Sequence, residues 1–167
     1  SEITLPTGRD HLGNDRTAVC CLSSLNLEKW DEWQGDKPFI EDVMRFLDNV
    51  LQDYIDRAPD EMARAKYSAG RERSVGMGVM GFHSFLQLKG IGFESAMAKA
   101  LNLKMFKHVA AKADEASMLL AEERGDAVAR RRVEIGGGDA EPLQHRVGEM
   151  PDRPVDAIDH QHVVAAP

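Results

Sequence analysis

The chain has 167 residues, of which 43% are apolar and 29% are charged, and its formal net charge is −7. No run of about 18 apolar residues occurs, which excludes a membrane span, and the acidic balance argues against nucleic acid or an anionic membrane surface as a partner. Its two cysteines, Cys20 and Cys21, are adjacent. This excludes a disulfide framework and favours a reducing compartment such as the cytoplasm.

Composition divides the chain after Arg124. Residues 125–167 contain no Phe, Trp, Tyr or Lys, and they include three consecutive glycines and three consecutive arginines. A stretch with so little to bury is typical of a poorly packed tail. We therefore predict one folded part, residues 1–124, followed by a tail of low order, residues 125–167.

The folded part begins irregularly. Residues 3–5 have the character of a short strand that stops at Pro6, and residues 8–14 are rich in turn formers. Residues 18–22 form an apolar run of strand length.

Residues 38–58 are predicted to form an amphipathic helix. Pro38 suits the first helical position, and Pro59 marks the end. Apolar residues recur at helical spacing on one face: Ile40, Val43, Met44, Leu47, Val50, Leu51 and Ile55. Polar residues fill the opposite face: Asp42, Arg45, Asp48, Asn49, Gln52 and Asp56.

Two further helices are predicted after a glycine-rich apolar segment at residues 75–81. The first covers residues 82–88 and is ended by Gly90. The second runs from about Ser95 to Arg124, is rich in helix formers and stops at Gly125.

The glycine-rich segment matches the G-x-G-x-x-G pattern at Gly76, Gly78 and Gly81. A dinucleotide site would need a buried strand before the pattern and an acidic residue about 20 positions after it. The sequence offers neither, because residues 68–74 are polar and no acid occurs at residues 98–103. We interpret these glycines as allowing close backbone packing where a strand meets a helix.

Several other residue types could carry chemistry. The Cys20-Cys21 pair could form a vicinal disulfide, hold a metal or react as a thiol, but its apolar neighbours favour plain burial. His83 lies between apolar residues and is expected to be a hydrogen-bonded core histidine. The basic residues near position 70 are interrupted by glutamates and are expected to be a solvated face: Arg64, Lys66, Arg71 and Arg73.

Three segments, taken in order, resemble the catalytic large subunit of ribonucleotide reductases. Residues 1–7 (Ser-Glu-Ile-Thr-Leu-Pro-Thr) look like the end of that family's active-site motif, Asn-Leu-Cys-x-Glu-Ile. Residues 18–27 (Ala-Val-Cys-Cys-Leu-Ser-Ser-Leu-Asn-Leu) are similar to a second segment. Residues 73–82 (Arg-Ser-Val-Gly-Met-Gly-Val-Met-Gly-Phe), with Leu-Ala-Glu-Glu-Arg-Gly at residues 120–125, are similar to a third.

The resemblance implies an α/β fold: a mainly helical fragment of the family's ten-stranded α/β barrel, followed by a non-native or disordered tail. The family replaces the 2′-hydroxyl of a ribonucleotide with hydrogen by thiyl-radical chemistry. Glu2 matches the carboxylate that takes the proton of the 3′-hydroxyl once a thiyl radical has removed the 3′-hydrogen. Cys20 matches one half of the redox cysteine pair that supplies two electrons and ends as a disulfide. Cys21 matches no required cysteine.

The resemblance also implies partners. The parent enzyme would be a cytoplasmic ribonucleoside-diphosphate reductase, expected to be a homodimer, that takes a ribonucleoside diphosphate and serves DNA synthesis. It would need a radical generator, either a metal-containing small subunit or adenosylcobalamin, and thioredoxin or glutaredoxin as reductant. No cofactor or metal site is expected in this chain itself.

Several family features are missing from the sequence. The thiyl-forming Cys is expected just before Ser1, where an intein junction could also lie, and the second redox Cys is expected far upstream. The isolated chain should therefore be inactive. A Pro-Ile-Ala-Pro phosphate loop is expected within residues 125–167, and codons permitted for residues 150–154 yield it when read one base later. We therefore hypothesise that the tail is out of frame, which the coding DNA would decide.

Two alternatives remain open at this point. The chain could be a non-enzymatic module that binds a partner through the apolar face of residues 38–58. It could also be a dinucleotide-binding domain.

Overall fold

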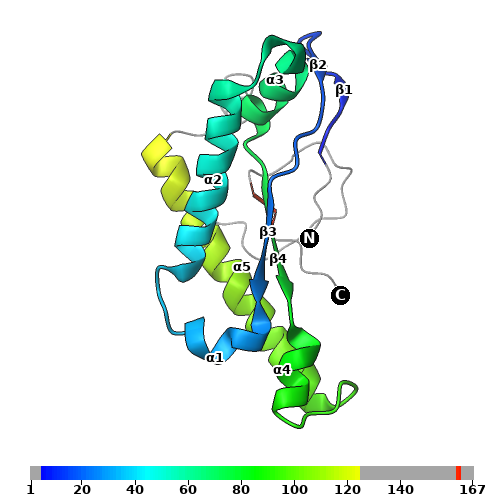
Figure 1. Ribbon diagram of the computed structural model, residues 1–167, viewed down its shortest axis with the longest axis vertical. Helices are drawn as coiled ribbons and strands as arrows, with labels where there is room; N and C mark the ends of the chain where they lie inside the picture. Colours follow the sequence, from blue (N-terminus) through cyan, green and yellow to red (C-terminus); the bar gives the residue numbers. More distant parts are fainter. Residues whose placement is uncertain (1–4, 125–160, 163–167) are drawn as a thin grey trace, which may run out of the picture.

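Two long helices pack along one side of a short parallel sheet in the computed structural model, which describes residues 5–124 and 161–162 (Figure 1). The strands are β1 (Gly8–Arg9), β2 (Asp15–Arg16), β3 (Leu22–Asn26), β4 (Val75–Met80) and β5 (Gln161–His162). The α-helices are α1 (Trp30–Trp33), α2 (Phe39–Arg57), α3 (Ala63–Glu72), α4 (Phe82–Leu88) and α5 (Ala96–Arg124). Short 3-10 helices occupy Leu27–Lys29 and Asp60–Met62.

The sheet is built on a β–α–β crossover. β3 pairs in parallel with β4, with Leu22 opposite Gly76 and Asn26 opposite Met80, and β5 pairs in parallel with the other edge of β4. Parallel strands need a long connection, and α1, α2 and α3 supply it. β1 and β2 form a separate antiparallel pair. This is the alternating strand–helix pattern of an α/β fold.

The core lies between the sheet and the helices α2 and α5, which run together along one side of β3 and β4 in Figure 1. Side chains at helical spacing in α2 meet alternate side chains of the strands, because a helix and a strand each present one face to a common core. The largest fully buried side chains are those of Leu27, Met44, Leu47, Leu51, Val75, Met77, Leu86, Met105 and Val109. This core fixes the strand pair against a rigid backing.

The three predicted helices are confirmed as α2, α4 and α5. The predicted strand at residues 18–22 is wrong in position, because β3 begins only at Leu22, where its partner β4 is available for pairing. Helix α3 was not predicted, since its polar sequence, Ala-Arg-Ala-Lys-Tyr-Ser-Ala-Gly-Arg-Glu, shows no broad apolar stripe.

The predicted tail, residues 125–167, lies outside the described residues except for β5. Residues 3 and 4 of the predicted first strand also lie outside them.

Candidate active site

Cys20 lies two residues before β3 with an exposed side chain, whereas the Cys21 side chain is half-buried. The backbone N–H of Gly76 donates to the carbonyl oxygen of Cys21 at 2.8 Å. Strand pairing therefore reaches the residue next to Cys20 and fixes the backbone there. Both thiols are free. An exposed thiol on a fixed backbone can exchange with another thiol or disulfide.

Cys21 is held by helix α2. Its thiol donates to the carbonyl oxygen of Leu47 at 3.5 Å, and its side chain packs against the core. Burial raises the pKa of the Cys21 thiol, and the nearby Cys20 and Asp48 raise it further. A thiol that stays protonated is a poor nucleophile. The burial predicted for the pair is thus partly confirmed for Cys21 and wrong for Cys20, because one residue's step along an extended chain reverses the side-chain direction.

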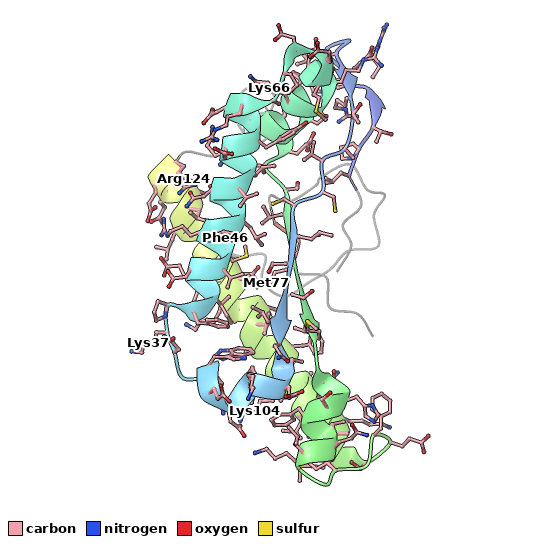
Figure 2. The ribbon with its side chains drawn as sticks, viewed as in Figure 1. Lys37, Phe46, Lys66, Met77, Lys104 and Arg124 are labelled. Atoms are coloured by element: carbon pink, nitrogen blue, oxygen red, sulfur yellow. The ribbon has the colours of Figure 1, made fainter. Side chains whose placement is uncertain are left out.

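The two faces of the sheet differ in character. Leu25 of β3 and the β4 residues Val75 and Met77, the last labelled in Figure 2, are buried in the core between sheet and helices. Side chains alternate along a strand, so Ser24, which is exposed, points to the opposite face. Cys20 is also exposed and lies four residues before Ser24, so the same alternation of side chains places it on the side away from the core. The chemistry-bearing thiol therefore shares the sheet face that α2 and α5 do not cover.

The other predicted site residue, Glu2, lies outside the described residues. The segment that follows it does return to the cysteine segment, since Leu5 and Pro6 line one small hollow together with Ala18 and Val19. Ser74, in the third family-like segment, lines the same hollow, so all three segments meet there. They are brought together by folding, although they are more than ten positions apart in the chain.

The structure contains a buried carboxylate, Asp48, that the sequence pattern did not predict. Asp48 of α2, whose side chain is 4% exposed, accepts from the Arg73 guanidinium at 2.6 Å and from the Arg124 guanidinium at the end of α5. Arg73 also donates to Gln52 Oε1 at 2.6 Å, and Arg124 donates to Asn49 Oδ1 at 2.7 Å. Helical spacing predicts Asp48 on the polar face of α2, but this position borders the apolar stripe. Only the two arginines from distant elements make its burial tolerable.

A family model described as "Ribonucleotide reductase, barrel domain" matches residues 1–132. The matched range contains Cys20, Asp48 and the whole β3–β4 unit. The chain belongs to the ribonucleotide reductase barrel-domain family. The fold expected from the resemblance, a mainly helical piece of an α/β barrel, is confirmed by this match.

Viral large subunits are among the relatives of this ribonucleotide reductase segment. It is 52% identical over 125 residues to the ribonucleoside-diphosphate reductase large subunit of Invertebrate iridescent virus 6, covering 75% of this chain and 12% of that protein. It is 45% identical over 130 residues to the putative large subunit of Frog virus 3, covering 76% of this chain and 22% of that protein. The chain thus spans no more than about a fifth of these relatives.

A solved structure of the same family has a similar fold. The class Id ribonucleotide reductase alpha subunit of Actinobacillus ureae matches with a TM-score of 0.63 and 36% identity, covering 68% of this chain and 22% of that one.

The glycine pattern of this ribonucleotide reductase segment is not a dinucleotide loop. Gly76 and Gly78 lie inside β4, and Gly81 follows the strand at the start of α4. A dinucleotide loop instead places its glycines after the strand, around the helix N-terminus. Gly81 has a φ of +79°, and a Cβ atom there would come within 3.0 Å of the backbone nitrogen of Glu28. The predicted close packing at a strand-to-helix junction is confirmed at this residue.

Two further expectations need correction. His83 is exposed and meets the Phe93 ring edge-on, so it is not a core histidine, because α4 turns Phe85 and Leu86 inward instead. The basic residues are not one solvated face. The side chain of Arg64 is 70% exposed, but that of Arg71 is 10% exposed and faces Asp10, and Arg73 pairs with Asp48.

The helical-module alternative also fails in this structure. Most of the apolar face of residues 38–58 is occupied by the protein's own core. Ile40, Met44, Leu47 and Leu51 are each about 2% exposed or less, and of the residues on that face Val50 is exposed, at 44%. Within residues 5–124 and 161–162, no helix is long and apolar enough to cross a membrane. The same residues contain no group of three or more His, Cys, Asp or Glu side chains suited to a metal ion.

Proposed function

We propose that this chain is part of the catalytic large subunit of a ribonucleoside-diphosphate reductase, which makes deoxyribonucleotides for DNA synthesis. The observation that carries the proposal is the exposed Cys20 thiol, fixed beside the β3–β4 ladder in a barrel segment of that family. The relatives with this segment are named as large subunits of that enzyme. The assignment of substrate and reaction to this chain rests on that likeness.

Cys20 would act as one half of the redox pair. In the overall reaction, a ribonucleotide and two thiols give a deoxyribonucleotide, water and a disulfide, so the pair supplies two electrons and two protons. An exposed thiol suits this work, because it must meet the substrate and then bond to its partner sulfur. The partner cysteine would come from outside this chain, since Cys21 is turned toward α2.

Glu2 would act as the base on the 3′-hydroxyl. A carboxylate in hydrogen-bond reach of the sugar can take that proton as the radical at C3′ forms. The neighbouring residues 5–6 approach the cysteine segment at residues 18–19, which supports a common site.

The whole enzyme would need partners beyond this chain. A radical generator, either a metal-containing small subunit or adenosylcobalamin, would supply the oxidising equivalent that starts the reaction. Thioredoxin or glutaredoxin would reduce the disulfide after each turnover.

We further propose a homodimeric parent enzyme in the cytoplasm and an out-of-frame origin for the tail. Sequencing the coding DNA of residues 150–165 tests the tail, and codons that forbid the Pro-Ile-Ala-Pro reading would disprove it.

The function can be tested by grafting. Residues 1–124 would replace the matching segment of the Invertebrate iridescent virus 6 large subunit, and the chimera would be assayed with its small subunit for conversion of a ribonucleoside diphosphate to the deoxy product. We expect activity in the chimera, none in the 167-residue chain alone, and loss of repeated turnover in Cys20→Ser. Cys21→Ser is the matched control and should retain turnover. Equal activity in both serine variants would overturn the assignment of Cys20.

Glu2→Gln in the same chimera should lower the rate of the chemical step while leaving substrate binding in place. An unchanged rate would remove Glu2 from the proposed site.

A further inference from the structure

One turn of helix α2 holds the segments that lead into both parallel strands. The backbone carbonyl of Leu47 accepts the thiol of Cys21, just before β3. The carboxylate of the next residue, Asp48, accepts two nitrogens of Arg73, which lies two residues before β4. These two contacts, from adjacent residues of one helix, reach both strands of the pair at the same end.

The Arg73 contact works against a backbone preference. Arg73 ends α3 in the left-handed conformation, with φ of 45°, which is unfavourable for a residue with a side chain. Its guanidinium is pinned by Asp48 on one side and by Gln52 on the other. The side chain is 19% exposed and that of Asp48 is 4% exposed. The turn from α3 into β4 is therefore fixed by α2 rather than by its own sequence.

The two held segments meet in the ladder. Gly76, three residues after Arg73, donates its backbone N–H to the carbonyl of Cys21. The Asp48–Arg73 contact holds the segment before β4, and the Leu47–Cys21 contact holds the segment before β3. The first hydrogen bond of the sheet then joins the two segments directly. Cys21 is therefore bonded to α2 through its thiol and to the first residues of β4 through its backbone carbonyl.

We propose that Leu47 and Asp48 of α2, with Arg73, are positioning residues that turn Cys21 inward and thereby present Cys20 alone on the open sheet face. The proposal rests on the proposed function, in that Cys20 is the thiol that must react. It gives Asp48 a part in the site without contact to substrate. It also explains how two adjacent thiols avoid competing for one partner sulfur, since they point to opposite sides of the chain.

The 167-residue chain tests the geometry directly. A short iodoacetamide pulse followed by peptide mass spectrometry measures the alkylation rates of Cys20 and Cys21 separately. We expect Cys20 to react at least about tenfold faster in the native chain, because thiolate fraction and exposure set the rate. In Asp48→Asn the rate of Cys21 should rise several-fold toward that of Cys20. With diamide as the two-electron oxidant, the two thiols of that variant should also form a Cys20–Cys21 disulfide, and diamide takes up their two electrons and two protons to become the hydrazine.

A second variant covers the case in which Asp48→Asn does not fold. Arg73→Gly removes the guanidinium, but glycine adopts the left-handed backbone without strain, so the chain should keep its far-UV circular dichroism while Cys21 loses protection. The matched control is Glu123→Gln, which breaks the ion pair between α2 and α5 at Arg45 but leaves Asp48 paired. It should leave both alkylation rates unchanged.

The outcomes separate the two proposals. Unchanged protection of Cys21 in a folded Asp48→Asn or Arg73→Gly variant would overturn the positioning role, as would equal effects in Glu123→Gln. In the chimera, Asp48→Asn should lower kcat with a dithiol reductant while KM for the nucleotide stays the same. If alkylation follows the expectation but Cys20→Ser leaves chimera turnover intact, the positioning of the thiols stands and the proposed function fails.

Discussion

Gly81 lies so close to Asn26 that a Cβ atom at position 81 would come within 2.5 Å of the Asn26 Oδ1 atom. That oxygen accepts the backbone N–H of Glu28 at 3.0 Å and caps the 3-10 helix that follows β3. The contact joins the end of β3 to the start of α4. Both ends of the parallel pair are therefore fixed, one by α2 and the other by this approach.

Gly81→Ala should be strongly destabilising. The new Cβ would displace the Asn26 cap, and alanine would be strained at a φ of +79°. We expect the free energy of unfolding, measured with urea, to fall by about 2–3 kcal/mol, from strain and a lost cap together. Gly90→Ala is the control, because its φ is +66° but a Cβ there meets nothing within 4 Å. It should lose only the strain, about 1 kcal/mol, and equal losses at both positions would refute the contact.

Helix α4 should tolerate the shortening of side chains on its exposed face but not on its buried face. Leu86 is fully buried, so Leu86→Ala should lower the free energy of unfolding by about 2–5 kcal/mol through lost burial and a cavity. Leu88, two residues on, is 71% exposed, and Leu88→Ala should change it by no more than about 0.5 kcal/mol. Comparable losses in the two variants, measured by urea denaturation, would contradict the placement of α4.

Asp10 should make the β1–β2 region sensitive to acid. A hydrogen bond from Tyr67, at 2.6 Å, lowers the pKa of this carboxyl from 3.8 to about 2, and the backbone N–H groups of Asn14 and Leu12 contribute. Because the folded pKa is depressed, the stabilisation is present above the ordinary pKa and is lost as the pH falls toward about 2. A carboxyl NMR titration should show the low pKa. Tyr67→Phe should raise it toward 3.8, and an unchanged titration in that variant would remove Tyr67 as the cause.

His108 should destabilise the fold when it is protonated. Its ring meets Trp30 edge-on at 5.3 Å, and burial lowers its pKa below 6.5, with Lys112 acting in the same direction. A depressed histidine pKa means that the neutral ring stabilises the fold above 6.5 and that this stability is lost as the pH falls through the folded value. His108→Phe, which keeps a ring against Trp30, should flatten the dependence of urea stability on pH in this range. A slope that persists in His108→Phe would assign it to another group.

The long helices could be predicted because the spacing of apolar residues that specifies them lies within each helix. Repeats such as Ile40, Met44, Leu47 and Leu51 place apolar side chains on one face whatever the rest of the chain does, and Pro59 marks the end. The strands were less predictable. β3 starts later than the apolar run at residues 18–22 suggests, because strand limits depend on the partner, here β4.

The helices α2, α4 and α5 and the family could be predicted from the sequence, because spacing and motif are properties of neighbouring residues. The match of Cys20 to a redox cysteine is a prediction of the same kind. The exposure of Cys20 rather than Cys21, and the burial of Asp48, could be seen only in the three-dimensional structure. Both depend on contacts between residues far apart in the chain, Leu47 with Cys21 and Asp48 with Arg73 and Arg124. A carboxylate beside an apolar stripe can be buried only if arginines pair with it. Here the arginines come from distant segments, so the local sequence around Asp48 cannot predict its burial.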